Sequence, residues 1–151
     1  MDRMLFERGF FLGIAFSILC GLIIGIERQI RGKPVGIRTS ILICLGTMLF
    51  IYLGTQVNEG KEAGRILGQV VTGVGFLGAG VIMNKEGLVS GVTSASVVWL
   101  LAGIGAFIGF GHYMAAVAIS FIALFILVGV EYLESIFKSL QHGVHRHRKG
   151  E

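Results

Sequence analysis

The sequence predicts an all-α membrane protein with five transmembrane helices. Charged residues make up only 15% of its 151 residues, against about 25% in soluble proteins. They are absent from four long stretches, residues 9–26, 39–58, 66–84 and 87–130. Because lipid offers the backbone no hydrogen bonds, such stretches should be helices. The polar and apolar alternation of a membrane β-barrel is missing from them.

The first three stretches contain 18, 20 and 19 residues, and about 20 apolar residues cross a bilayer core once. The fourth stretch has 44 residues, so the glycine-rich segment 109–113 should divide it into two helices joined by a short turn. The first stretch lacks a small-residue cleavage site after it, and we interpret it as an anchor rather than a cleaved signal. Bulky residues in 121–128 predict a fifth helix that faces lipid.

Lysine and arginine residues set the expected orientation. Four of them lie on the side of the N-terminus and the second loop, and nine lie on the side of the first loop, the third loop and the C-terminus. The positive-inside rule therefore puts the N-terminus outside and the C-terminus in the cytoplasm. The net charge of +4 lies beside lipid headgroups, which favours membrane lipids over nucleic acid as partners.

We expect two parts, a transmembrane domain at residues 1–137 and a short basic cytoplasmic tail at 138–151 with no soluble domain. His142, His145 and His147 lie close together in the tail, but no cysteine completes a ligand set, so a solvated tail is favoured over a metal site. Cys20 and Cys44 fall inside predicted helices and are expected to be buried free thiols. No cofactor is predicted.

Glycine supplies 24 residues, about twice its usual share. Small residues recur at every fourth position of the first helix: Gly9, Gly13, Ser17, Gly21 and Gly25. Small residues let helix backbones approach closely in lipid, so this face should pack against a neighbouring helix. The same spacing recurs at Gly64, Gly68 and Thr72, and at Gly105 and Gly109.

The third stretch is denser still, with Gly73, Gly75, Gly78 and Gly80 within eight residues. Part of it matches a dinucleotide-binding glycine fingerprint, but the strand, helix and acidic residue that this fingerprint needs are missing. Two interpretations remain. The glycines serve tight helix packing, or the helix breaks at mid-membrane and exposes backbone groups to a cavity or partner.

Hydroxyl residues precede the fourth helix. Ser90, Thr93 and Ser94 are each candidates for its N-cap. Those that do not cap can bond back to the helix or to a neighbour. An anion site at this helix N-terminus is the alternative.

The first loop carries the most concentrated polar chemistry. Glu27 follows directly on an apolar run, Arg31 lies one helical turn after it, and Arg38 and Thr39 start the second helix, with Thr39 a candidate N-cap. The cations of this loop could serve only to set topology. Alternatively, Glu27, Arg28, Arg31 and Arg38 form a polar cluster that holds helix ends together, or that grips a lipid phosphate or an acidic residue of a partner.

Together these segments resemble the MgtC/SapB family of bacterial inner-membrane proteins. The resemblance runs from about Gly9 to Tyr113 and rests on Gly25-Ile26-Glu27-Arg28-Gln29, Gly36-Ile37-Arg38-Thr39, residues 73–82, Gly91-Val92-Thr93-Ser94-Ala95 and Trp99. It implies a non-enzymatic membrane protein linked to growth in low magnesium and, in pathogens, to intracellular survival. It also implies binding to other membrane machinery, including the proton-translocating ATP synthase.

Two departures from the family are visible. Many members carry a C-terminal ACT-like domain, which this chain is too short to contain. Relatives have Leu-Asn-Thr or Leu-Thr-Thr where this sequence has Val92-Thr93-Ser94, so a role that needs an asparagine amide at Thr93 is not carried over.

Two classes of function compete. The first is a regulatory protein that docks its glycine-faced helices on partner helices or on further copies of itself. The second is an ion or small-solute transporter, which usually needs an ionisable group deep in the membrane. Gln69, Thr72, Thr93 and Ser94 are the most polar interior groups, which favours docking. The sequence shows no nucleophilic side chain paired with a general base, so an enzymatic function is not expected.

Overall fold

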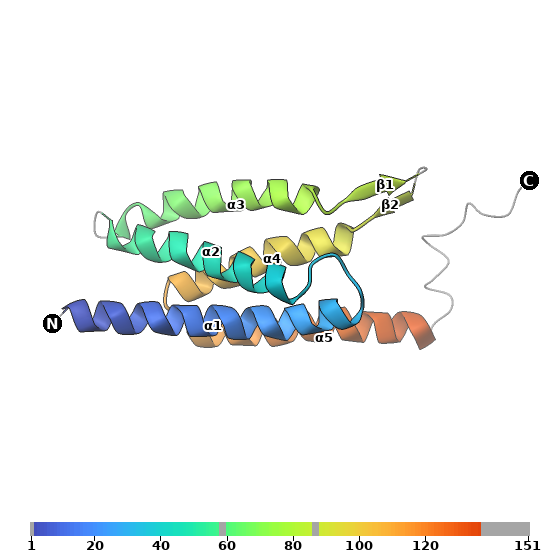
Figure 1. Ribbon diagram of the computed structural model, residues 1–151, viewed down its shortest axis with the longest axis horizontal. Coiled ribbons are helices and arrows are strands. Elements are labelled where there is room, and N and C mark those ends of the chain that lie inside the picture. The colour runs from blue at the N-terminus through green and yellow to red at the C-terminus, as the bar shows by residue number, and fades with distance from the viewer. Residues whose placement is uncertain (1, 58–59, 86–87, 137–151) are drawn as a thin grey trace, which may run out of the picture.

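The computed structural model describes residues 2–57, 60–85 and 88–136, which form a helical bundle with one small hairpin (Figure 1). Its elements are α1 (Asp2–Ile30), α2 (Ile37–Gln56), α3 (Ala63–Ala79), β1 (Met83–Lys85), β2 (Leu88–Ser90), α4 (Val92–Gly109) and α5 (Tyr113–Ile136). The predicted all-helical class is confirmed apart from the hairpin, in which β1 and β2 pair antiparallel. The histidines of the tail lie outside the described residues.

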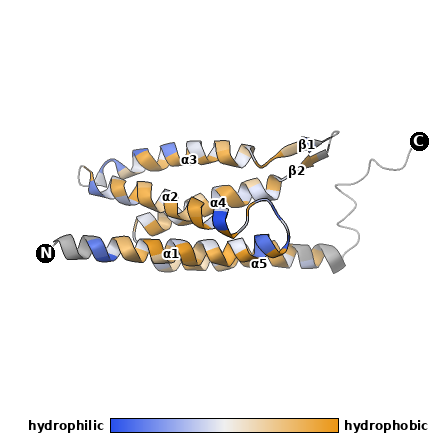
Figure 2. Cartoon of the chain, viewed as in Figure 1, coloured by the Kyte–Doolittle hydropathy of each residue, from blue (hydrophilic) through white to orange (hydrophobic). Residues whose placement is uncertain are grey.

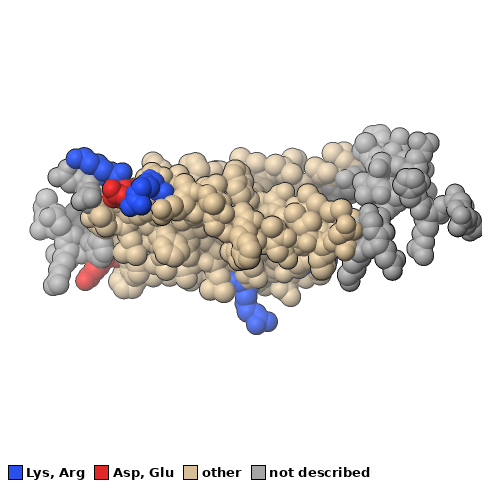
Figure 3. Space-filling view, turned by 90° about the horizontal axis from the view of Figure 1, so that it is seen from above, with Lys and Arg blue, Asp and Glu red and all other residues tan. Residues whose placement is uncertain are grey.

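Four helices, α1, α2, α4 and α5, are long and apolar enough to cross a membrane. Helix α3 is apolar but has only 17 residues, a rise of about 25 Å against a hydrocarbon core of about 30 Å. Apolar residues dominate all five helices (Figure 2). On the face shown in Figure 3, most charged side chains gather at one end, beside a long uncharged surface. The five-span count remains a prediction, because α3 alone is too short to establish it.

The helices run along one common axis, and their connections alternate between the two ends of the bundle (Figure 1). The N-terminus, the α2–α3 connection and the α4–α5 turn lie at one end. The α1–α2 loop, the hairpin and the end of α5 lie at the other. This alternation matches the two groups of loops from which the orientation was predicted, although it does not identify the cytoplasmic end.

Helix α2 lies between α1 and α4, and α4 is the most buried of the four long helices. The core is formed by residues such as Ile24, Met48, Leu101, Ile104 and Ile108. Helix α5 packs on α1 and α4 through small residues including Ala116, Ser120 and Ala123, while many of its large apolar side chains, such as Phe121 and Phe125, are exposed. Helix α3 is at the edge, against α2 and α4.

Glycines bring the backbones of α1, α2 and α4 together. A Cβ added at Gly21 would lie 2.6 Å from the Ile41 Cα atom, and one at Gly25 would lie 2.7 Å from the Ile37 Cα atom. On the opposite side of α2, a Cβ at Gly105 would lie 2.4 Å from the Cys44 carbonyl oxygen. Because no real Cβ tolerates such distances, these contacts require glycine.

The other members of the α1 small-residue face lie along the same seam. A Cβ at Gly13 would meet only the flexible Met48 side chain, at 3.0 Å, and one at Gly9 would be in ordinary contact with Tyr52. Ser17 is fully buried, and its hydroxyl has no hydrogen-bond partner among the described residues. The face therefore packs most tightly at its C-terminal half.

Both predicted N-caps differ from those in the structure. Helix α2 begins one turn earlier than expected, with Gly36 rather than Thr39 at its N-cap, and α4 has Gly91 at its N-cap rather than a hydroxyl residue. Gly91 has a φ of +90°, and a Cβ there would lie 2.2 Å from the Val81 carbonyl oxygen. The close approach of the turn between α3 and β1, together with the positive φ, thus selects glycine over a side-chain cap.

The third uncharged stretch also differs from the prediction. Helix α3 is continuous through Gly73, Gly75 and Gly78 and ends at Ala79, with Gly80 at its C-cap. The mid-membrane break considered for this segment is therefore not present. Met83 and Asn84 at the end of the stretch belong instead to β1 of the hairpin.

Candidate functional site

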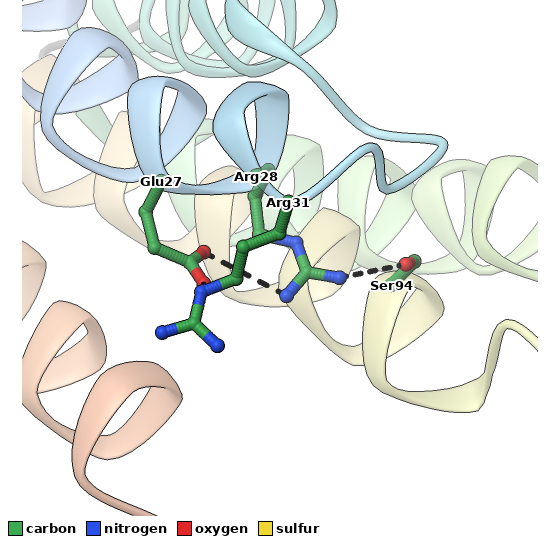
Figure 4. A network of polar contacts seen from close by, with 4 residues as sticks. All are labelled: Glu27, Arg28, Arg31 and Ser94. Carbon is green, nitrogen blue, oxygen red and sulfur yellow. Dashed lines mark hydrogen bonds and ion pairs between the residues drawn. The ribbon is translucent and has the colours of Figure 1, made fainter. Parts of the chain in front are cut away.

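A polar cluster joins the end of α1 to the start of α4. Arg28 reaches from α1 and donates a hydrogen bond from Nη2 to the Ser94 Oγ atom at 3.0 Å (Figure 4). Its Nη1 atom is 3.7 Å from a Glu27 carboxylate oxygen. The other oxygen of Glu27 is 2.6 Å from the Arg31 Nε atom. The cluster therefore contains three of the four charged residues predicted for the first loop, together with the predicted Ser94.

The cluster is buried despite its charges. Arg28 is only 3% exposed and Glu27 only 8% exposed. A charge at such a position is costly unless it is paired. Helix α1 continues to Ile30, which keeps Arg31 one turn after Glu27 and allows the pair to form.

Arg38 is not part of this cluster. It is exposed on the first turn of α2 and forms no hydrogen bond or ion pair with any residue that the structure describes. The reason is the direction of that turn, because Ile37 and Ser40 face α1 at Gly25 and leave Arg38 directed away from it. The predicted cluster of Glu27, Arg28, Arg31 and Arg38 is therefore wrong in its inclusion of Arg38.

A cavity of about 630 Å³ adjoins the cluster. Its described lining comes from the α1–α2 loop, the hairpin, the start of α4 and the middle of α5, and its polar members are Arg28, Lys33, Ser90, Thr93 and Ser94. Three of them, Ser90, Thr93 and Ser94, are the hydroxyl residues that were predicted as candidate N-caps of the fourth helix. The structure thus brings the first loop and the start of α4 to one place.

A second hollow is an apolar groove of about 620 Å³ between α2 and α3. Thr39, Thr47 and Gln69 are its polar lining residues, and Gly46 and Gly73 widen it. Two predicted site residues, Thr39 and Gln69, are therefore brought together here, away from the polar cluster. No Asp, Glu, Lys or Arg is among the described lining residues.

The remaining glycines of α3 are mostly open. A Cβ at Gly64, Gly68, Gly73 or Gly75 would meet no described atom within 4 Å, whereas one at Gly78 would contact Ala95 of α4 at 3.5 Å. Spacings of four and seven residues place Gly64, Gly68 and Gly75 on one side of the helix, hereafter the α3 glycine face. Of these five glycines, Gly78 alone has a described neighbour within 4 Å, at the distance of an ordinary van der Waals contact.

Two predicted residues stand apart from both hollows. Trp99 is 59% exposed on α4, and Gly80 caps α3. Two important residues were missed. Lys33 lines the cavity, and Gly91 fixes the start of α4; the only sequence signal for Gly91 was a glycine directly before a helical apolar run.

Comparison with known proteins places the chain in a family. Residues 14–136 match the family model described as "MgtC family". "Protein MgtC" of Salmonella typhimurium is 38% identical over 124 residues, covering 82% of this chain and 53% of that protein. "Putative magnesium transporter YhiD" of Escherichia coli K12 is 40% identical over 122 residues, covering 76% and 56%. "Protein SapB" of Bacillus subtilis is 36% identical over 138 residues, covering 85% and 58%.

The chain thus spans somewhat more than half the length of the curated relatives that it matches. No solved structure matches it. The family match extends from the glycine face of α1 to the end of α5, and it includes both the polar cluster and the α3 glycine face. The apolar helices and these relatives together make the chain a membrane protein, and it belongs to the MgtC family.

Proposed function

We propose that the chain is a non-enzymatic regulatory protein of the bacterial inner membrane that docks on helices of other membrane proteins through the α3 glycine face. The observation that supports this most directly is the open space around Gly64, Gly68 and Gly75. Glycine lowers helix stability by about 1 kcal/mol per residue relative to alanine. No described residue of this chain would contact a Cβ at any of these three glycines. Their presence on one face is therefore consistent with packing against a helix of another chain.

The surroundings of this face favour a helix as the occupant. Phe76 is 82% exposed, and Val71 is also exposed. In lipid, helices associate through close backbone approach and dispersion, so a face of small residues beside large apolar ones suits a transmembrane helix. The partner helix belongs to another membrane protein or to a second copy of this chain.

The biological setting that we propose is adaptation to low magnesium. The family resemblance implies it, and a relative carries the name "Putative magnesium transporter YhiD". The same resemblance makes the proton-translocating ATP synthase the first partner to examine. In this proposal the chain crosses the membrane five times, with the N-terminus outside and the first loop and C-terminus in the cytoplasm.

The test is site-specific photo-crosslinking in living cells, with the crosslinker at Thr72 beside the α3 glycine face. We expect crosslinks to a membrane protein or to a second, differently tagged copy. Gly75→Leu should reduce their yield about tenfold, equivalent to about 1.4 kcal/mol of association free energy. Gly103→Leu is the matched control, because Gly103 is also exposed and open but lies on α4. Equal yields for the two variants would contradict docking through α3.

Transport of an ion or small solute is the second candidate. The name of the Escherichia coli relative, "Putative magnesium transporter YhiD", favours transport. The groove between α2 and α3, with Thr39, Thr47 and Gln69 in its lining, also favours transport. A carrier usually places an ionisable group in its pathway, and none lines the described groove. Magnesium flux into liposomes that contain only this chain would reverse the order of the two candidates.

A further inference from the structure

The cavity beside the polar cluster has the chemistry of an anion site. Its described lining contains two cationic side chains, Arg28 and Lys33, and no carboxylate. The side chain of Lys33 is exposed and forms no hydrogen bond or ion pair with a described residue. Its ammonium group is therefore available to a ligand.

Arg28 provides the second and independent sign of a ligand. The side chain is almost completely buried and lines the cavity. Its Nε–H group has no acceptor among the described residues, and its Nη1 atom, at 3.7 Å from Glu27, is beyond hydrogen-bond distance. Buried donors are nearly always satisfied. A negatively charged group in the cavity would provide this buried guanidinium with a further partner, and charge-assisted hydrogen bonds of this kind are strong.

The start of α4 completes the lining. Helix α4 has 18 residues, and its N-cap residue is Gly91. Because glycine has no side chain, no side-chain cap bonds to the first N–H groups of the helix. A helix N-terminus of this kind favours a negative group. Thr93 lines the cavity too, and its hydroxyl has no partner among the described residues.

We propose that this cavity binds a phosphoryl group, held by Arg28, Lys33 and the N-terminus of α4. The opposite wall is apolar and includes Ile126 and Val130 of α5, both about half exposed. A phosphate beside an apolar wall is the chemistry of a phospholipid headgroup with its acyl chains on α5. Free phosphate or a soluble phosphate ester has the same phosphoryl group without the chains. This site does not depend on whether the chain docks on other proteins or transports a solute.

The experiment measures binding to the purified full-length chain in dodecyl maltoside. Native mass spectrometry compares dioleoyl phosphatidic acid with dioleoylglycerol, two lipids that differ only in the phosphate. Titration calorimetry with inorganic phosphate, at constant ionic strength, measures binding without acyl chains. The test variant is Lys33→Gln, and the matched control is Arg38→Gln, an exposed cation of the same segment that does not line the cavity.

We expect the chain to bind phosphatidic acid in preference to dioleoylglycerol. Lys33→Gln should weaken this binding about fivefold, the effect of one juxtamembrane cation, and Arg38→Gln should change it less than twofold. Arg28→Lys keeps the charge but loses the planar guanidinium and its additional donors, and should weaken binding further while circular dichroism shows an unchanged helix content. Should Arg28→Lys fail to fold, the Lys33 and Arg38 pair still decides the question.

The two lipid arms and the phosphate arm separate the sources of the ligand. Binding of phosphatidic acid alone supports a headgroup site, and saturable binding of inorganic phosphate that competes with the lipid supports a free anion. The site is overturned if both lipids bind equally and phosphate does not bind. Equal weakening by Lys33→Gln and Arg38→Gln would also overturn it, because it would indicate general surface charge.

Discussion

Arg28 and Ser94 stand 66 residues apart in the chain, and their side chains form a buried hydrogen bond of 3.0 Å that ties α1 to α4. The bond fixes the position of the guanidinium, which lines the cavity. The same arginine lies between this serine and Glu27. The position of the proposed anion site therefore depends on a contact between two helices.

Removal of the Ser94 hydroxyl should destabilise the fold. Ser94→Ala leaves a buried charged donor without its acceptor, and we expect a loss of about 1–3 kcal/mol in the free energy of unfolding. Ser96→Ala is the control, because Ser96 is exposed and bonds only to the Val92 carbonyl of its own helix. Thermal unfolding in detergent measures both. A similar change in the two variants would contradict a structural role for the Arg28–Ser94 bond.

Neutralisation of Glu27 should be more severe. Glu27→Gln leaves Arg28 buried without its carboxylate and removes the pair with Arg31, and breaking a buried ion pair costs about 3–5 kcal/mol. Glu62→Gln breaks an ion pair on α3 with Arg65, a residue whose side chain is 66% exposed, and pairs of this kind contribute about 0–1 kcal/mol. Denaturant unfolding in detergent should separate the variants, and equal midpoints would refute burial of the Glu27 pair.

Two glycines of α4 should respond in opposite directions to alanine. Gly105→Ala forces a Cβ to within 2.4 Å of the Cys44 carbonyl oxygen, so overpacking should cost about 1–3 kcal/mol. Gly103→Ala meets no described atom within 4 Å and should stabilise the helix by about 0.4–1 kcal/mol. The melting temperatures of the two variants should therefore lie on opposite sides of the wild type. Lower stability of Gly103→Ala would indicate an unseen neighbour at that position.

The start of α4 should be equally sensitive to a methyl group. Gly91→Ala combines a left-handed φ with a clash on the Val81 carbonyl oxygen, whereas Gly32→Ala has a φ of +62° and open space around it. The left-handed conformation costs an L-residue about 1–2 kcal/mol, which is the whole cost expected at Gly32. Gly91→Ala should lose clearly more, and hydrogen exchange should rise in the hairpin. Equal losses would mean that the hairpin moves away freely.

Hydropathy and charge were enough to predict the helices, because burial in lipid requires apolar side chains and internal hydrogen bonds. They could not locate the end of α3, since Val81, Ile82 and Met83 continue the apolar run although the helix ends at Ala79 and Met83 begins β1. Apolar side chains indicate that a segment lies away from water, but they do not indicate the residue at which a helix ends. The N-caps were missed because glycines, Gly36 and Gly91, cap helices for which hydroxyl residues were expected. At Gly91 the backbone of the turn between α3 and β1 leaves no room for a side chain.

The candidate site was predictable in its parts. The loop residues Glu27, Arg28 and Arg31 attract notice because charge follows an apolar run, and Ser94 because hydroxyl residues precede a helix. Their meeting was not predictable, since no periodicity relates residue 28 to residue 94. For Arg38 the error was the opposite one. Its proximity to Glu27 in the sequence suggested a contact, but the first turn of α2 directs Arg38 away from α1.

The glycine contacts on both sides of α2 also restrict how the molecule can move. The Cα atom of Ile41 lies within Cβ reach of Gly21 on one side, and the Cys44 carbonyl lies within Cβ reach of Gly105 on the other. With so little clearance, α2 cannot slide or roll without separating from both neighbours, so α1, α2 and α4 should shift only as one rigid body. Helix α3 has no such restraint along its glycine face. Any conformational change that transmits a signal through this protein should therefore be a displacement of α3 relative to that body.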